Sequence, residues 1–170
     1  MEFRLRPWKP EDLDSLVYHA NNDAVARNMA DQFPHPYTRE KGEAFLQSAM
    51  QGTPPNILAI EVEGAAAGGI GVHLQGDIYC RNAELGYWLG EAFWGRGIMP
   101  VAVRQMVAYG FQHWPVNRIF ARPFGRNKAS QRVLENAGFI LEAVFEQTIF
   151  KWGQVEDEYV FAIRRAAAGI

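Results

Sequence analysis

A glycine-rich turn stands directly before an apolar helical pattern in residues 91–106, which read EAFWGRGIMPVAVRQM. Gly95 and Gly97 would let the main chain approach a ligand closely, because neither residue carries a Cβ atom. The first N–H groups of a helix lack partners within it and carry positive potential, so this segment could bind a phosphate group. Arg96 adds a positive charge, and Pro100 fits a first helical turn. The alternative is that the turn only leads into a core helix.

A second segment repeats this arrangement about thirty residues later, in residues 126–139, which read RNKASQRVLENAGF. Asn127 is the predicted N-cap of a short helix, and Gly138 is the residue that ends it. Neither segment matches the glycine patterns of triphosphate or dinucleotide sites. Because ligands in open α/β sheets bind beyond the carboxyl ends of the strands, we expect both helix starts to face one elongated phosphate-bearing cofactor.

The period of the apolar residues predicts the elements that position these two turns. We predict one irregular segment at 21–37, four helices at 10–20, 38–51, 98–114 and 127–137, and seven strands at 3–8, 57–64, 68–76, 82–90, 117–123, 139–150 and 156–164. Tight turns would join the three central strands. The acidic run 156–158 would be a solvated turn into the last strand. This order predicts an α+β fold, a mixed sheet with helices on its faces.

Composition bounds the class of protein. The chain has 170 residues, of which 48% are hydrophobic, enough for one core, so we expect a single domain over residues 1–170. The net charge of −2 argues against nucleic-acid and membrane partners. Cys80 is the only cysteine and the start lacks signal-peptide character, so we expect a cytoplasmic protein. Its four histidines are scattered, and we expect no metal site.

Three motifs together resemble the GCN5-related N-acetyltransferase (GNAT) superfamily, and most closely its branch of ribosomal-protein-alanine N-acetyltransferases. They are AELGYWL at 83–89, WGRGIM at 94–99 and NKASQRVLENAGF at 127–139, and the likeness covers nearly the whole chain. The resemblance implies a mostly antiparallel sheet that splays between its fourth and fifth strands, so that acetyl-CoA lies between them.

The resemblance also implies roles for individual residues. The backbones of one strand end would pair with the pantetheine arm, the amides of the glycine turn would bind the pyrophosphate, and the second helix start would lie near the thioester sulfur. The residues of the strand end are Tyr87, Trp88 and Leu89. Those of the glycine turn are Trp94, Gly95, Arg96, Gly97, Ile98 and Met99. Those of the second helix start are Asn127 and Ser130.

The chain departs from the family pattern at several positions. Trp94 and Met99 replace the residues that usually open and close the turn, although the Trp-Gly-x-Gly form is typical of the branch. The tyrosine that many members use as general acid would fall at Leu134, which has no proton to give. Some relatives in the branch carry a glutamate on the sixth strand, where this chain has Ile149, with Glu146 nearby.

Acetyl transfer needs an uncharged amine, donors toward the developing oxyanion and a proton for the departing thiolate. We expect the Leu89 amide to stabilise the oxyanion. Glu84 is the candidate base, directly or through a water molecule, if burial raises its pKa; the alternative is a solvent-facing strand residue. Ser130 is the candidate for hydrogen bonding the sulfur, and its alternative is a helix-start serine bonded to the backbone.

The acceptor site follows from the resemblance, because in this family the segment between the first two helices shapes the acceptor pocket. Phe33, His35 and Tyr37 are its candidates here, and His73 could face the acceptor from a strand unless it is a structural histidine. The amine acceptor would be a protein N-terminus or a small molecule, and the protein a monomer or homodimer. The alternatives are a non-catalytic acyl-CoA-binding module and an α+β domain with incidental glycine turns.

Overall fold

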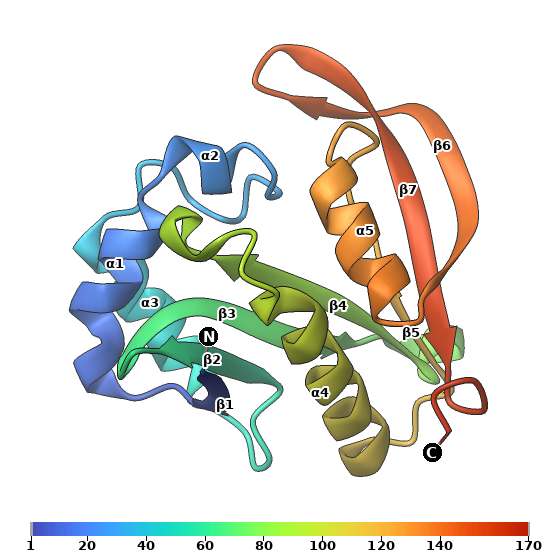
Figure 1. Ribbon diagram of the computed structural model, residues 1–170, viewed down its shortest axis with the longest axis horizontal. Helices are drawn as coiled ribbons and strands as arrows, with labels where there is room; N and C mark the ends of the chain where they lie inside the picture. Colours follow the sequence, from blue (N-terminus) through green and yellow to red (C-terminus); the bar gives the residue numbers. More distant parts are fainter. Residues whose placement is uncertain (1, 170) are drawn as a thin grey trace. The chain divides into compact units, whose positions relative to one another are not determined.

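The computed structural model describes residues 2–169 and contains one seven-stranded sheet in the order β1-β2-β3-β4-β5-β7-β6 (Figure 1). The strands are β1 (Phe3–Pro7), β2 (Ile57–Val62), β3 (Ala65–Leu74), β4 (Asn82–Leu89), β5 (Arg118–Ala121), β6 (Ile140–Lys151) and β7 (Gln154–Arg164). The helices are α1 (Leu13–Ala20), α2 (Asp23–Ala26), α3 (Arg39–Ala49), α4 (Ile98–His113) and α5 (Lys128–Asn136), with 3-10 turns at Pro10–Asp12, Asp77–Tyr79 and Glu91–Phe93. The predicted α+β class is confirmed, and the element order matches the predicted one except for α2, which lies in the segment predicted to be irregular. Among residues 2–169, no helix has the length and apolar character needed to cross a bilayer.

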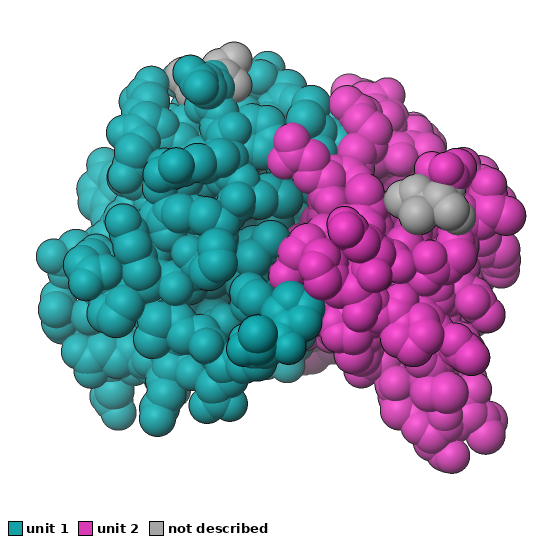
Figure 2. Space-filling model, turned by 90° about the horizontal axis from the view of Figure 1, so that it is seen from below, with its two compact units in different colours: residues 1–71, 87–102 teal, residues 72–86, 103–170 magenta. Residues whose placement is uncertain are grey.

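The chain divides into two compact units (Figure 2). Unit 1 contains Met1–Gly71 and Tyr87–Ala102, and unit 2 contains Val72–Gly86 and Val103–Ile170. Three elements, β3, β4 and α4, therefore begin in one unit and end in the other. That the whole chain behaves as one domain stays a prediction.

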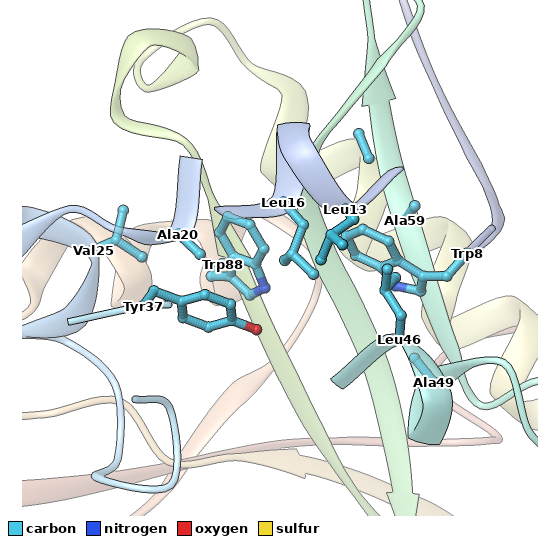
Figure 3. Packing of buried hydrophobic residues seen from close by; sticks show 11 residues of the cluster. Trp8, Leu13, Leu16, Ala20, Val25, Tyr37, Leu46, Ala49, Ala59 and Trp88 are labelled. Atoms are coloured by element: carbon cyan, nitrogen blue, oxygen red, sulfur yellow. The ribbon is translucent and has the colours of Figure 1, made fainter. Parts of the chain in front are cut away.

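The core of unit 1 forms where α1 and α3 lie side by side along the first strands (Figure 1). Leu13, Leu16 and Ala20 recur at helical spacing on α1 and are buried. Thr38 caps α3 by accepting a hydrogen bond from the Lys41 amide at 3.3 Å. Figure 3 shows these side chains of α1 packed with others of the same cluster.

A partly buried ionic group connects β1 to β2 and to the start of α1 in unit 1. Arg4 faces Glu61 across the β1–β2 pair, and Arg6 also donates to Glu61. The same Arg6 guanidinium donates to both oxygens of Asp12, each at 2.7 Å. Hydrogen bonds from the two arginines lower the pKa of Glu61 to about 2, so this carboxylate stays ionised in its buried position.

Unit 2 contains the only parallel strand pair recorded within residues 2–169. Asn82, Ala83 and Glu84 of β4 pair with Arg118, Ile119 and Phe120 of β5, and β4 then continues to Leu89. The short pairing is what a sheet that opens between its fourth and fifth strands requires. The pairs β1–β2, β2–β3, β5–β7 and β6–β7 are antiparallel, so the predicted mixed, mostly antiparallel sheet is confirmed.

Two details of the predicted strand connections are wrong. The acidic run 156–158 lies within β7, because the two-residue turn that starts this strand is formed earlier by Trp152 and Gly153, both with positive φ (48° and 80°). Glu156 is not solvated there, since it pairs with Arg126 at 2.6 Å. The segment 75–81 between β3 and β4 is not a tight turn but contains a 3-10 helix, whereas residues 63 and 64 do form the predicted tight turn between β2 and β3.

Candidate active site

The turn after β4 in unit 1 has the arrangement that the glycine pattern predicts. A 3-10 helix at Glu91–Phe93 follows β4, and α4 begins at Ile98. The Trp94 indole N–H donates to the Leu89 carbonyl at 2.7 Å and thereby closes the segment onto the end of the strand. Pro100 is the third residue of α4, where a missing N–H removes no helical hydrogen bond.

Gly95 and Gly97 are required by the backbone conformation of this turn. Their φ angles are 71° and 74°, in the left-handed region that side chains disfavour. No protein atom lies within 4 Å of a Cβ built on either residue, so the space beside both Cα atoms is open. The first N–H groups of α4 have no acceptor within the helix. The turn therefore fits a phosphate group, and a side chain at either glycine would occupy the space that such a group needs.

Residues at the end of α1 hold this turn in unit 1. The Asn22 side-chain amide donates to Glu91 at 2.8 Å, and the His19 ring lies 5.5 Å from the Phe93 ring. The Arg96 guanidinium is 5.6 Å from the centre of the same Phe93 ring. The positions of His19 and Asn22 were not predicted, because no spacing in the sequence connects α1 to a turn some seventy residues later.

The backbone of the last β4 residues is oriented by pairing with β3. The Gly90 amide donates to the Ala67 carbonyl at 2.8 Å. Because N–H and C=O groups alternate in direction along an antiparallel strand, Trp88 also faces β3, and the Tyr87 and Leu89 amides face away from it. The Leu89 amide thus points away from β3, whereas the Trp88 backbone belongs to the β3 side.

The aromatic residues expected at the acceptor site are partly core residues. Phe33 lies 5.2 Å from Tyr37 and 5.7 Å from Trp88, centre to centre. Tyr37 and Trp88 are buried among the apolar side chains in Figure 3, and burial raises the pKa of Tyr37 to about 12. Phe33 is half-buried and His35 is exposed, with its Nε2 atom 2.9 Å from Asp23. Of the three candidates in this segment, Phe33 and His35 are accessible to a ligand, and Tyr37 is buried.

Glu84 in unit 2 is paired with an arginine that sequence analysis did not assign. Its two carboxylate oxygens accept from Nε and Nη2 of Arg122 at 3.0 and 3.1 Å, and its side chain is 29% exposed. This bidentate bond raises the pKa of Arg122. A strongly basic carboxylate needs burial without a positive partner. Glu84 instead has the surroundings of a carboxylate that is held in place by a cation.

The helix α5 begins as predicted. The Asn127 side-chain oxygen accepts from the Ser130 amide at 3.1 Å, and Gly138, with φ 93°, follows the helix end. Because its oxygen is used for capping, Asn127 would offer a ligand its side-chain nitrogen. Ser130 is half-buried. Leu134 is fully buried, so this position has neither a proton to donate nor access to a ligand.

On β6, neither Ile149 nor Glu146 evidently takes the place of the glutamate that some relatives carry on this strand. Ile149 is half-buried and lies opposite Glu156 of β7. Glu146 is exposed within an irregular stretch of β6, where the register shifts between Phe145 and Ile149. Cys80 is exposed in unit 2, and within residues 2–169 no three His, Cys, Asp or Glu side chains converge as metal ligands would.

The family model of the acetyltransferase (GNAT) domain matches residues 2–140. An 83-residue region is 42% identical to "Probable N-acetyltransferase YjcK" of Bacillus subtilis (strain 168), covering 49% of this chain and 46% of that protein. A region of 82 residues is 30% identical to the ribosomal-protein-serine acetyltransferase of Escherichia coli (strain K12), covering 48% and 46%. The chain spans about half the length of the curated relatives it matches.

Solved structures share the fold over nearly the whole chain. RimL, a ribosomal L7/L12 alpha-N-protein acetyltransferase in complex with coenzyme A, superposes with a TM-score of 0.84 at 21% identity, covering 97% of this chain and 95% of that one. The spermidine N-acetyltransferase from Vibrio cholerae in complex with CoA and spermine gives 0.81 at 17% identity, covering 99% and 98%. With the family match over most of its length, the chain belongs to the GNAT acetyltransferase family, as its motifs predict.

Proposed function

We propose that the chain is an acetyl-CoA-dependent N-acetyltransferase, in which a primary amine attacks the thioester directly in a ternary complex. The observation that supports this most is the turn between β4 and α4. Two left-handed glycines with open space beside them precede a helix start, directly after a strand whose pairing with β5 ends at Glu84. Such a turn suits a pyrophosphate, and the backbone of β4 beyond Glu84 suits an extended amide-containing arm.

The cofactor-binding residues follow from this arrangement. Amides of the turn from Trp94 to Met99 would bind the pyrophosphate, and the Tyr87 and Leu89 backbones would pair with the pantetheine arm. The Leu89 amide would also donate to the oxyanion that develops on the thioester carbonyl. Asn127 and Ser130 would lie near the sulfur atom, where Ser130 stabilises the departing thiolate. When bound, acetyl-CoA supplies the activated acyl group.

The acceptor is a protein N-terminal amine or a small-molecule amine, received beside Phe33, His35 and His73. Both acceptor classes stay open, because the similar proteins include a ribosomal-protein-serine acetyltransferase and a spermidine N-acetyltransferase. The cytoplasmic location, the absence of nucleic-acid and membrane partners, the absence of a metal and the monomeric or homodimeric state stay predictions.

A second candidate function is an acyl-CoA-binding module without catalysis. The burial of Leu134 favours it, because the family's usual proton donor has no counterpart at that position. Release of free CoA from acetyl-CoA, measured with a thiol reagent, separates the two. The amines to test are spermidine, alanine- and serine-starting peptides, and free amino acids. We expect turnover with at least one amine. Tight acetyl-CoA binding by calorimetry with no CoA release for any amine would favour the module.

Ser130→Ala should lower turnover about tenfold or more and leave acetyl-CoA affinity nearly unchanged, because one hydrogen bond to a charged group such as the thiolate contributes about 1.5–3 kcal/mol. The Asn127 cap survives in this variant, since it uses the backbone amide of residue 130. The measurements are kcat by CoA release and Kd by calorimetry. Ser48→Ala, at an exposed helical position of α3, is the matched control. Equal kcat in Ser130→Ala and wild type would leave Ser130 only a structural role.

A further inference from the structure

His73 and Glu84 are cross-strand neighbours in unit 2. The Gln75 amide donates to the Asn82 carbonyl at 3.0 Å, and this antiparallel register places His73 of β3 directly opposite Glu84 of β4. The adjacent Val72 packs toward Gly110 of α4, with its methyl carbons 3.5 and 3.6 Å from a Cβ built there. Because side chains alternate along a strand, the His73 ring lies on the sheet face away from α4.

The His73 imidazole lies beside Gly86, a residue of β4 without a side chain. A Cβ built on Gly86 would lie 3.6 Å from the Nε2 atom of His73 and 3.9 Å from its Cδ2 atom. Gly86 therefore leaves open the space beside the ring nitrogen that could receive a proton. It also directly precedes the β4 residues whose backbone we propose to bind the cofactor.

The charged groups around the His73 ring indicate different roles for the imidazole and for the Glu84 carboxylate. The charged groups on the packed elements are Glu84, its partner Arg122 after β5, and Glu158 of β7, which acts on Arg122. Glu84 uses both oxygens to bind Arg122. Desolvation of the ring lowers the pKa of His73, and the negative charge of Glu84 opposes this in part. A lowered pKa favours the neutral imidazole, which is the form that can accept a proton.

We propose that His73 is the catalytic base of the reaction and that Glu84, held by Arg122, is a positioning residue that stabilises the imidazolium. This assignment rests on the proposed function. The acceptor ammonium gives one proton to Nε2 of His73. The amine lone pair then forms the C–N bond at the thioester carbonyl, the C–S bond breaks, and the second amine proton goes to the leaving thiolate. His73 finally releases its proton to water, so that amide, CoA thiol and one proton are the products.

His73→Gln should lower kcat/KM for the best amine about 100-fold or more at pH 7, the lower end of what a positioned base contributes. The deficit should shrink toward pH 9, where more of the amine is already unprotonated in solution. Added imidazole should restore activity to His73→Gly. Acetyl-CoA affinity should stay within about twofold in both, because neither variant removes a group that we place on the cofactor. His113→Gln, an exposed histidine of unit 2, is the matched control.

Glu84→Gln distinguishes this assignment from one in which Glu84 is the base. If His73 is the base, the acidic limb of the pH–rate profile persists and moves to lower pH, because the charge that raises the His73 pKa is gone. If Glu84 is the base, the limb disappears. Loss of the limb in Glu84→Gln, or an unchanged rate and profile in His73→Gln, would overturn the assignment of His73 and leave the acetyltransferase standing.

An NMR titration of the labelled imidazole gives a readout that does not depend on turnover. We expect His73 to titrate below the usual histidine value of about 6.5 and lower still in Glu84→Gln. A pKa of His73 at or above that value, or one that is unchanged in Glu84→Gln, would contradict the assignment. Wild-type protein that acetylates no amine would instead overturn the proposed function, and the base assignment with it.

Discussion

Gly97→Val should weaken acetyl-CoA binding by about 100-fold or more while leaving the protein folded. A β-branched residue at φ 74° is strained by about 1–3 kcal/mol, so the turn would relax away from its present conformation. The amides at the start of α4 would then lose their common direction. Hydrogen bonds to a charged group contribute about 1.5–3 kcal/mol each, and losing two of them suffices for a 100-fold effect. Calorimetric titration with acetyl-CoA measures it.

Gly64→Val is a matched control for this prediction. Gly64 lies in the β2–β3 turn of the same unit, has φ 85°, and also has no protein atom within 4 Å of a built Cβ. Valine should therefore strain the two turns comparably and lower Tm by similar amounts. Only Gly97→Val should lose affinity. Equal affinities in the two variants would exclude the turn after β4 from the cofactor site and would leave its glycines a purely conformational role.

The sequence predicts best those features that depend on a residue and its near neighbours along the chain. Thr38 and Asn127 cap their helices through amides three residues later, and Gly138 follows the end of α5. The turn containing Gly95 and Gly97 is likewise local, because positive φ values favour glycine in any fold. These features could be assigned without knowing which strands are neighbours.

Features that depend on strand register could not be predicted in the same way. The Glu84–Arg122 pair forms because β4 and β5 run in parallel with Glu84 opposite Phe120, and the spacing of the two residues does not reveal this. The burial of Tyr37 could not be predicted either, because it depends on tertiary packing and its neighbours in the chain are polar or exposed. The acidic run in β7 was misassigned for the same reason, since its charge is balanced by residues such as Arg126 that are distant in sequence.

Asp12→Ala should reduce the free energy of unfolding by about 3–5 kcal/mol, as expected when one partner of a buried ion pair is removed. Asp12 is 4% exposed, and the Arg6 side chain that it binds through two hydrogen bonds is 13% exposed. The variant would leave this guanidinium with the Pro7 carbonyl and with Glu61, which already binds Arg4. The Lys9 amide, which donates to Asp12 at 3.0 Å, would also lose its acceptor at the start of the helix. Urea unfolding followed by circular dichroism gives the free energy.

Asp14→Ala tests whether the loss of stability in Asp12→Ala comes from the burial of its ion pair and not from the loss of a charge alone. Asp14 also pairs with an arginine, Arg39, at 2.6 Å, but its side chain is 85% exposed and that of Arg39 is 65% exposed. Exposed pairs contribute about 0–1 kcal/mol, because water and salt screen them. Asp14→Ala should therefore unfold near the wild-type urea midpoint, while Asp12→Ala unfolds well below it. Similar small losses in both variants would mean that water reaches Arg6 once Asp12 is gone, and that the ionic group between β1, β2 and α1 does not stabilise unit 1.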